Sequence, residues 1–191
     1  MGDHKDHDGR GDHKDDADDP EARARQVCLR LLKLAPRTRA QLADALRKRG
    51  IPDIVAVGVL DRYADVGLID DAAFARAWVE SRHYSRGLAG RALAAELKQR
   101  GVDSGEIRDA IEELGPDAEV ATARKLVVQR LAGTRGQPAQ ARTRRLSGML
   151  ARKGYPPGLA FRVIREAMEA EGADGAPGEE PYFDDPDAFT E

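Results

Sequence analysis

The chain has 191 residues, of which 41% are hydrophobic, 34% charged and 5% aromatic. This balance favours a slender helical protein with much exposed surface over a sphere around one large core. No window holds 18 successive apolar residues, and the N-terminus has no apolar stretch of a secretory signal, so we expect no membrane association and a cytoplasmic location. One cysteine, Cys28, excludes an internal disulfide framework and a cysteine-based zinc site.

The net charge of −3 averages three regions of different sign. Residues 1–20 hold eight Asp and three Lys or Arg, a net −5, and residues 171–191 hold eight Asp or Glu and no Lys or Arg, a net −8. Residues 21–170 therefore hold 28 basic and 18 acidic residues, a net +10. A basic body between two acidic ends predicts a polyanionic partner such as nucleic acid.

The two acidic ends, 1–20 and 171–191, are predicted to be disordered tails. The first has almost no apolar side chains and repeats an Asp-His-Lys-Asp phrase that resembles an engineered epitope tag, while the second is rich in Gly, Pro and acids. Neither can bury enough surface to offset the entropy lost on ordering. We expect no metal site at His4, His7 and His13.

Helical periodicity runs through the chain between these ends. The first helix places Val27, Leu31 and Leu34 on one face, and the second opens with the capping-box spacing Thr38-x-x-Gln41. No segment alternates as a strand would, so we predict an all-α fold. The nine helices are expected at residues 21–35, 38–49, 53–67, 70–85, 90–101, 103–115, 117–133, 140–154 and 156–170.

One phrase returns three times: LRKRGI at 46–51, LKQRGV at 97–102 and LARKGY at 150–155. When Gly50, Gly101 and Gly154 are aligned, apolar residues coincide in four columns. The columns are Leu42, Leu93 and Leu146; Leu46, Leu97 and Leu150; Ile51, Val102 and Tyr155; and Leu60, Ile111 and Ile164. Each unit is a helix, a glycine C-cap in the left-handed conformation and a second helix.

A further helix precedes each of these units, so the nine helices divide into three modules of three. We predict an elongated, curved array of three tandem three-helix repeats, at 21–67, 68–115 and 116–170. Such an array suits binding along a long partner.

The sequence offers little for catalysis. It has no phosphate-binding loop, no HExxH and no GxSxG motif. Cys28 is expected to be buried, His83 to lie in an exposed basic stretch, and the Asp70–Asp71 pair to cap the following helix rather than to act as a dyad. We therefore predict that the protein is not an enzyme and uses no metal or cofactor.

Aromatic side chains are too few for a platform that stacks bases. Phe74 and Trp78, spaced i and i+4, are expected in the core. Tyr84 and Tyr155 are expected to be exposed.

Basic clusters recur before each repeated glycine and elsewhere along the chain. Cations at a helix C-terminus interact favourably with the helix dipole, which accounts for some of them without any partner. The dipole does not account for cations in the first half of the 140–154 helix. A repeated row of cations matches phosphates along a filament. The candidate partner- or DNA-binding residues are Arg47, Lys48, Arg49, Arg82, Arg86, Arg91, Lys98, Arg100, Arg142, Arg144, Arg145, Arg152 and Lys153.

Three stretches of the chain resemble the bacterial regulatory RecX family, especially its actinobacterial members. They are LADALRKRGIPDIVAVGVLDRYADVGLIDDAAFARAWVESR, GRALAAELKQRGVDSGEIRDAI and, further on, MLARKGY. The resemblance covers roughly residues 22–170 and rests on the ordered combination of motifs, not on any single one. Asp71, Phe74 and Ala75 match the family phrase DD-x-x-FA, which we interpret as a helix cap and a core anchor.

The resemblance implies tandem three-helix repeats and an activity. Proteins of this family bind the RecA recombinase filament on DNA, lodge in its helical groove, and inhibit ATP hydrolysis and strand exchange, and some bind DNA directly. The expected partners are therefore the RecA filament, single-stranded DNA and also double-stranded DNA, and the expected state is a monomer.

A DNA-binding transcription regulator is the alternative, because residues 38–69 resemble a helix-turn-helix or winged-helix unit. Its presumptive recognition helix at 53–67 has one basic residue, Arg62, and no Asn or Gln that could read bases.

Overall fold

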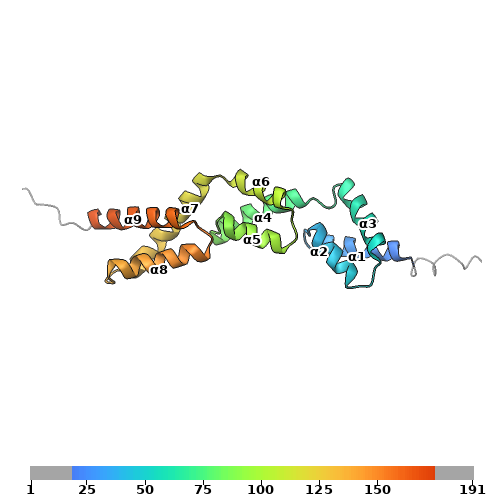
Figure 1. The fold of residues 1–191 in the computed structure, drawn as a ribbon, viewed down its shortest axis with the longest axis horizontal. Coiled ribbons are helices and arrows are strands. Elements are labelled where there is room, and N and C mark those ends of the chain that lie inside the picture. The colour runs from blue at the N-terminus through green and yellow to red at the C-terminus, as the bar shows by residue number, and fades with distance from the viewer. Residues whose placement is uncertain (1–18, 175–191) are drawn as a thin grey trace, which may run out of the picture. The chain divides into compact units, whose positions relative to one another are not determined.

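The computed structural model describes residues 19–174, which form nine α-helices and one short 3-10 helix, with no strand among them (Figure 1). The predicted all-α fold is therefore confirmed. The tails predicted at 1–20 and 171–191 lie outside the described residues, except where α1 and α9 extend into them.

The helices follow the order expected from the sequence. They are α1 (Pro20–Leu34), α2 (Arg39–Arg47), α3 (Asp53–Asp65), α4 (Asp71–Arg86), α5 (Gly90–Gln99), α6 (Ser104–Leu114), α7 (Pro116–Leu131), the 3-10 helix η1 (Ala132–Thr134), α8 (Ala139–Arg152) and α9 (Pro157–Asp174). The chain divides into two compact units, 1–119 and 120–191, whose boundary falls within α7.

Each repeated glycine ends its helix in the same hydrogen-bonded motif. Gly50 has φ 71° and Gly101 has φ 75°. The glycine N–H donates to the carbonyl three residues back, and the next N–H donates to the carbonyl five residues back, as in Ile51 N to Leu46 O at 3.2 Å. This pattern is a Schellman motif, and it brings the apolar residue after glycine onto the repeated leucine. The predicted left-handed C-cap is confirmed, at Gly154 as well.

The four apolar columns supply the cores. In the first repeat Leu42, Leu46, Ile51 and Leu60 are buried together with Cys28. In the second, Leu93, Leu97 and Val102 are buried and Ile111 packs against them. In the third, Leu146, Leu150, Tyr155 and Ile164 are buried. Each fully buried side chain of this kind contributes about 1.5–3 kcal/mol relative to exposure.

The first two repeats, both in the first unit, meet through backbone and small side chains. Thr38 forms the predicted capping box with Gln41, and its hydroxyl also donates to the carbonyl of Arg100 at 2.6 Å. The N–H of Arg39 donates to Asp71 Oδ1 at 2.9 Å. Burial raises the pKa of Asp71, and the hydrogen bond from Arg39 acts in the opposite direction. The start of α2 is therefore fixed to the second repeat.

Three expectations about single side chains are wrong. Leu34 is 75% exposed, because α1 turns Ala24 and Cys28 into the core instead. Tyr155 is 2% exposed, since it occupies the position that closes over the glycine turn. His83 is 1% exposed, and its Nδ1 lies 2.9 Å from the carbonyl oxygen of Leu88 in the loop that covers it.

Helix α9 is longer than expected. α9 continues to Asp174, past residue 170, where the repeat was expected to end. The extra turn carries Glu171, which pairs with Arg142 of α8 and with Arg135. This interaction holds the end of α9 to the rest of the repeat.

Candidate functional site

The predicted cations do not form one uniform row, because several are bound within their own repeat. Arg47 and Lys48 both reach Asp44, at 3.5 and 2.7 Å, and Arg49 donates to the carbonyl of Ala45 at 2.8 Å. All three are exposed. The hydrogen bond from Lys48 lowers the pKa of Asp44. Exposed pairs of this kind are weak, so these cations can exchange Asp44 for an external anion.

A second group surrounds Trp78. The guanidinium carbons of Arg82 and Arg100 lie 4.2 and 3.7 Å from its ring centroid. The indole N–H donates to Glu96 Oε2 at 2.8 Å, and Glu96 also lies 3.8 Å from Arg82 and 3.9 Å from Arg86. Arg100 donates in addition to the backbone carbonyl of Glu96 at 2.8 Å. These contacts give Arg82, Arg86 and Arg100 a structural role in the second repeat.

Trp78 itself packs against Phe74, with the rings stacked at 5.7 Å. Both were expected in the core, and the structure instead places them half-buried against the second core. Two arginines already lie over the Trp78 ring, so a base would have to displace a guanidinium group to stack on that part of it.

Arg142 is also held internally. It pairs with Glu171, and its Nε donates to Thr134 Oγ1 at 2.9 Å. Its side chain is 15% exposed and that of Glu171 is 18% exposed. No local pattern in the sequence explains a cation at this position. The structure explains it by this contact between α8 and α9.

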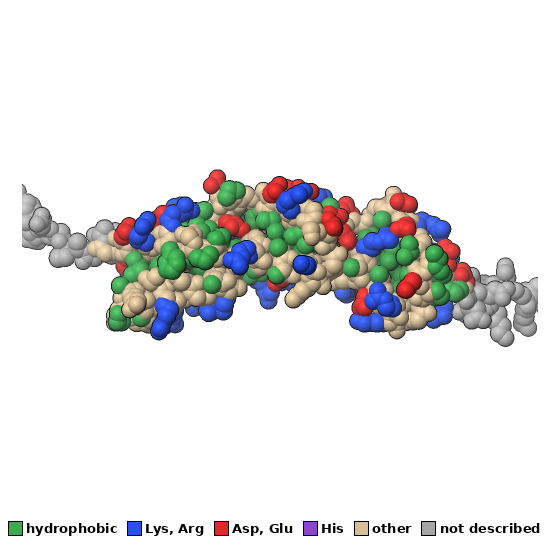
Figure 2. Space-filling view, viewed as in Figure 1, with side chains coloured by type: hydrophobic (Ala, Val, Ile, Leu, Met, Phe, Trp, Pro, Cys, Tyr) green, Lys and Arg blue, Asp and Glu red, His purple; other side chains and the backbone are tan. Residues whose placement is uncertain are grey.

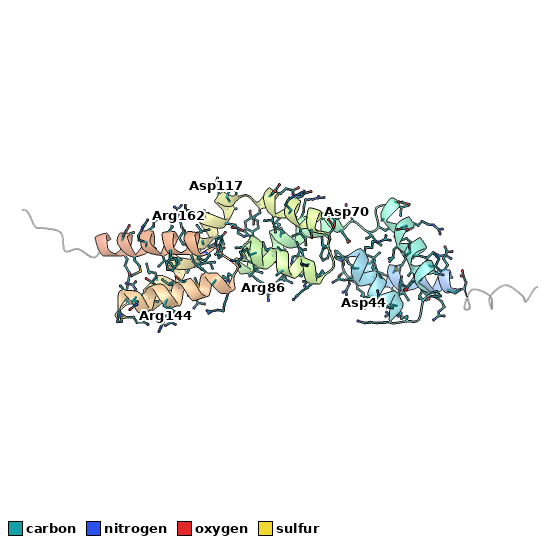
Figure 3. The ribbon with its side chains drawn as sticks, in the orientation of Figure 1. Asp44, Asp70, Arg86, Asp117, Arg144 and Arg162 are labelled. Carbon is teal, nitrogen blue, oxygen red and sulfur yellow. The ribbon has the colours of Figure 1, made fainter. Side chains whose placement is uncertain are left out.

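Five predicted cations are exposed and make no ion pair with another described residue: Arg91, Lys98, Arg144, Arg145 and Arg152. Lys153 is half-buried and has a partner within the protein. Figure 2 shows Lys and Arg side chains along the lower edge of α8, and Figure 3 places Arg144 there. These five residues, which we call the unpaired cations, are the part of the predicted set most available to an external anion.

The structure adds Arg130, which the sequence did not single out. Arg130 lies in the last turn of α7 and lines the same hollow as Arg145 and Arg152 of α8. The spacing of Arg145 and Arg152, seven residues or two helical turns, indicates a shared face. No local pattern connects them with Arg130, which lies on another helix.

The first unit also carries a mainly apolar groove of about 590 Å³. Leu32, Leu68, Phe74 and Trp78 line it between the first and second repeats, and Arg37 lies at its edge. Leu68 is 49% exposed. Such a groove can accept apolar side chains of another protein.

Other candidate chemistry finds structural explanations. Cys28 is buried, and burial raises the pKa of its thiol, which disfavours the reactive thiolate. Asp70 caps α4, accepting from the N–H of Ala73 at 2.7 Å, as predicted. Within residues 19–174 no group of three or more His, Cys, Asp or Glu is placed to hold a metal ion. His4, His7 and His13 lie outside the described residues.

The helix-turn-helix alternative gains no support from α3. Its one basic residue, Arg62, donates to Glu21 Oε1 at 2.8 Å and is thereby tied to α1. Ile54 and Val57 are 82% and 48% exposed on this helix, which gives it an apolar rather than a base-reading face. No helix of the described residues is long and apolar enough to cross a membrane.

Comparison with known families decides the relationship. Three family models match in order: the first three-helix domain of RecX at residues 24–62, the second at 70–111 and the third at 117–164. The chain belongs to the RecX family. The RecX models fall on the three repeats, and the predicted recognition is confirmed.

Relatives of known name agree with this assignment. A regulatory protein RecX of Thermobifida fusca is 64% identical over 153 residues, which are 80% of this chain and 83% of that protein. The RecX of Streptomyces lividans is 58% identical over 82% of this chain and 83% of its own length. That of Mycolicibacterium smegmatis is 47% identical over 81% and 84%. The relatives are named regulatory proteins.

Solved structures support the fold. The crystal structure of RecX from Lactobacillus salivarius matches with a TM-score of 0.74 at 18% identity, covering 78% of this chain and 97% of that one. A second crystal structure of a regulatory protein RecX matches with a TM-score of 0.70 at 24% identity, over 80% and 74%. The three-repeat helical fold is therefore shared at low sequence identity.

Proposed function

We propose that this protein regulates homologous recombination and DNA repair by binding the RecA filament on DNA, in the cytoplasm and as a monomer. In this proposal it lies in the helical groove of the filament and inhibits ATP hydrolysis and strand exchange. It does so by occupancy and not by chemistry of its own, so it acts as a non-enzymatic regulator. The observation that carries the proposal is membership of the RecX family together with exposed cations that pair with no acidic side chain of residues 19–174.

The unpaired cations supply the electrostatic part of the contact. Each is already exposed, so an incoming phosphate or carboxylate need not displace an internal partner. Contacts to phosphate position a protein without reading sequence, which suits a filament that covers DNA of any sequence. Binding to single-stranded and to double-stranded DNA follows from the same charges and weakens as salt rises. The groove beside Leu68 and Phe74 offers the protein partner an apolar contact.

The test is the DNA-dependent ATPase of RecA, titrated with the full chain. We expect inhibition that saturates near the molar amount needed to occupy the filament. Substitution of three unpaired cations, Arg91→Gln, Lys98→Gln and Arg144→Gln, should shift the inhibition curve to at least tenfold higher protein.

A matched control separates the specific contact from net charge. Arg62, Arg108 and Arg165 are exposed and already paired with Glu21, Asp109 and Glu169. Changing these three to Gln alters net charge by the same amount and should shift the curve less than threefold. Unchanged ATPase at a large molar excess of the wild-type chain would refute the proposal, and equal shifts in the two triple variants would remove the specific role of the unpaired cations.

A further inference from the structure

We infer that Arg130, Arg145 and Arg152 form a binding site for a backbone phosphate of single-stranded DNA in the third repeat. The site deepens the proposed function by giving its DNA contact a location. It lies wholly within the second unit, in a hollow of about 290 Å³ formed by α7, η1 and α8.

The charge of this hollow is one-sided. Its lining consists of the three arginines with Gly133, Thr134, Leu146 and Met149, and no Asp or Glu lines it. All three arginines are exposed, and none pairs with another described residue. Elsewhere in the second unit Arg124 reaches Glu166 at 3.0 Å and Arg135 reaches Glu171 at 2.7 Å. The hollow thus brings together three arginines that form no ion pair with any residue from 19 to 174.

The repeat does not require these charges. Aligned on the repeated glycines, Arg145 corresponds to Gln41 and Ala92, and Arg152 to Lys48 and Gln99. Arg130 and Arg152 lie in the last turns of their helices, where the helix dipole favours a cation. Arg145 lies in the middle of α8 and has no such account. The dipole also does not explain why all three meet at one hollow.

The chemistry of the lining selects a phosphate over a base. Three guanidinium groups offer paired N–H donors that fit phosphate oxygens. No aromatic side chain lines the hollow, so a base would find no stacking partner. The hydroxyl of Thr134 donates to the carbonyl of Leu131 at 2.6 Å and accepts from Arg142, so it adds no free donor for reading an edge.

The size of the hollow fits the same ligand. A volume of about 290 Å³ lies just below the range of small-molecule sites, about 300–1,000 Å³. It holds a phosphate with its sugar, for which the half-buried Met149 forms an apolar surface. Because the cations and the apolar surface contact phosphate and sugar and no base, we expect DNA binding without sequence preference.

The experiment measures binding of the full chain to a fluorescein-labelled oligothymidylate by anisotropy, at several salt concentrations. Arg145→Gln/Arg152→Gln should weaken binding at least tenfold near 0.1 M salt. It should also reduce the slope of log K against log salt by about 0.7, the value for one lost phosphate contact on a single strand. Arg145→Lys keeps the charge but lacks the planar guanidinium group, so its affinity for the oligonucleotide should lie between those of the wild type and the double variant.

The control is Arg108→Gln/Arg165→Gln, which removes the same charge from paired, exposed positions and should weaken binding less than twofold. A circular dichroism melt of each variant shows whether it is folded. Inorganic phosphate at constant ionic strength should displace the oligonucleotide no better than chloride. Displacement at low millimolar phosphate would overturn the assignment to DNA backbone in favour of a free-phosphate site.

Failure of this inference and failure of the proposed function give different results. Absence of DNA binding by the wild-type chain, or equal weakening in both double variants, overturns the site. Loss of DNA binding in Arg145→Gln/Arg152→Gln upholds the site, whatever the effect on RecA. If the wild-type chain leaves the ATPase of RecA unaffected, only the RecA proposal is refuted.

Discussion

Gly101 is expected to be less replaceable than Gly50, the corresponding glycine of the first repeat. It has φ 75°, and a Cβ at this position would lie under 3.0 Å from the Cβ of Ala40 in α2. Gly50 has nearly the same φ, 71°, but nothing lies within 4 Å of its added Cβ. The pair therefore separates the cost of the left-handed conformation from the cost of the clash between the first two repeats.

The magnitudes follow from these two terms. Gly50→Ala should destabilise by about 1–2 kcal/mol, the cost of the left-handed conformation for a residue with a Cβ. Gly101→Ala bears the same cost and adds about 1–3 kcal/mol for overpacking against α2. The backbone of α2 cannot easily retreat, since Thr38 and Arg39 at its start are bonded to Arg100 and Asp71.

Urea unfolding followed by circular dichroism measures both variants. The double variant Gly101→Ala/Ala40→Gly removes the clashing methyl group. Its free energy of unfolding should therefore exceed the value expected from adding the two single changes, by most of the overpacking cost. The reasoning is refuted if Gly101→Ala is no more destabilising than Gly50→Ala, or if the double variant shows simple additivity.

Three further predictions concern the internal contacts. Hydrogen bonds from two arginines lower the pKa of Glu171, so its contribution to stability is present above the unfolded pKa of about 4.3 and is lost as the pH falls through the lower folded pKa. The difference in Tm between wild type and Glu171→Gln should therefore shrink below about pH 4. A difference in Tm that stays constant with pH would contradict this prediction. Arg100→Ala should cost about 1–2 kcal/mol and shift the emission of Trp78 to the red, whereas Arg91→Ala should cost under about 0.5 kcal/mol and leave the emission unchanged; similar losses would remove the distinction. Tyr155→Ala should cost about 3–5 kcal/mol in urea unfolding, and a loss below about 1 kcal/mol would mean that its burial contributes little.

The features that the sequence predicted correctly are those set by local physics. The spacing of Leu42 and Leu46 puts two side chains on one helix face, and a glycine after a basic turn is a known way to end a helix. Both signals occur within a few residues, and their repetition at Gly101 makes coincidence improbable. The capping box at Thr38 is local in the same sense.

The features that it missed depend on residues distant in the chain. Arg142 meets Glu171, 29 residues away, and Trp78 meets Arg100 from a neighbouring helix. The spacing of charged residues in the sequence does not predict which cation forms an ion pair within the protein. Arg130 was overlooked for the same reason, because its relation to Arg145 exists only once α7 and α8 are packed.

His83 and Tyr155 are buried although both carry polar groups, which the sequence prediction placed at the surface. The imidazole of His83 is buried with a carbonyl 2.9 Å from its Nδ1, so its polar atom is satisfied without water. Tyr155 belongs to the same column as Ile51 and Val102, and the column predicted its burial correctly where its hydroxyl group suggested exposure.

The most direct test of the account is binding of the full chain to RecA filaments assembled on single-stranded DNA with a slowly hydrolysed ATP analogue. Biolayer interferometry with immobilised filaments should show saturable binding that weakens with salt, and at least tenfold weaker binding when Arg91, Lys98 and Arg144 are changed to Gln. No binding at micromolar protein, or binding indifferent to these residues, would contradict the account.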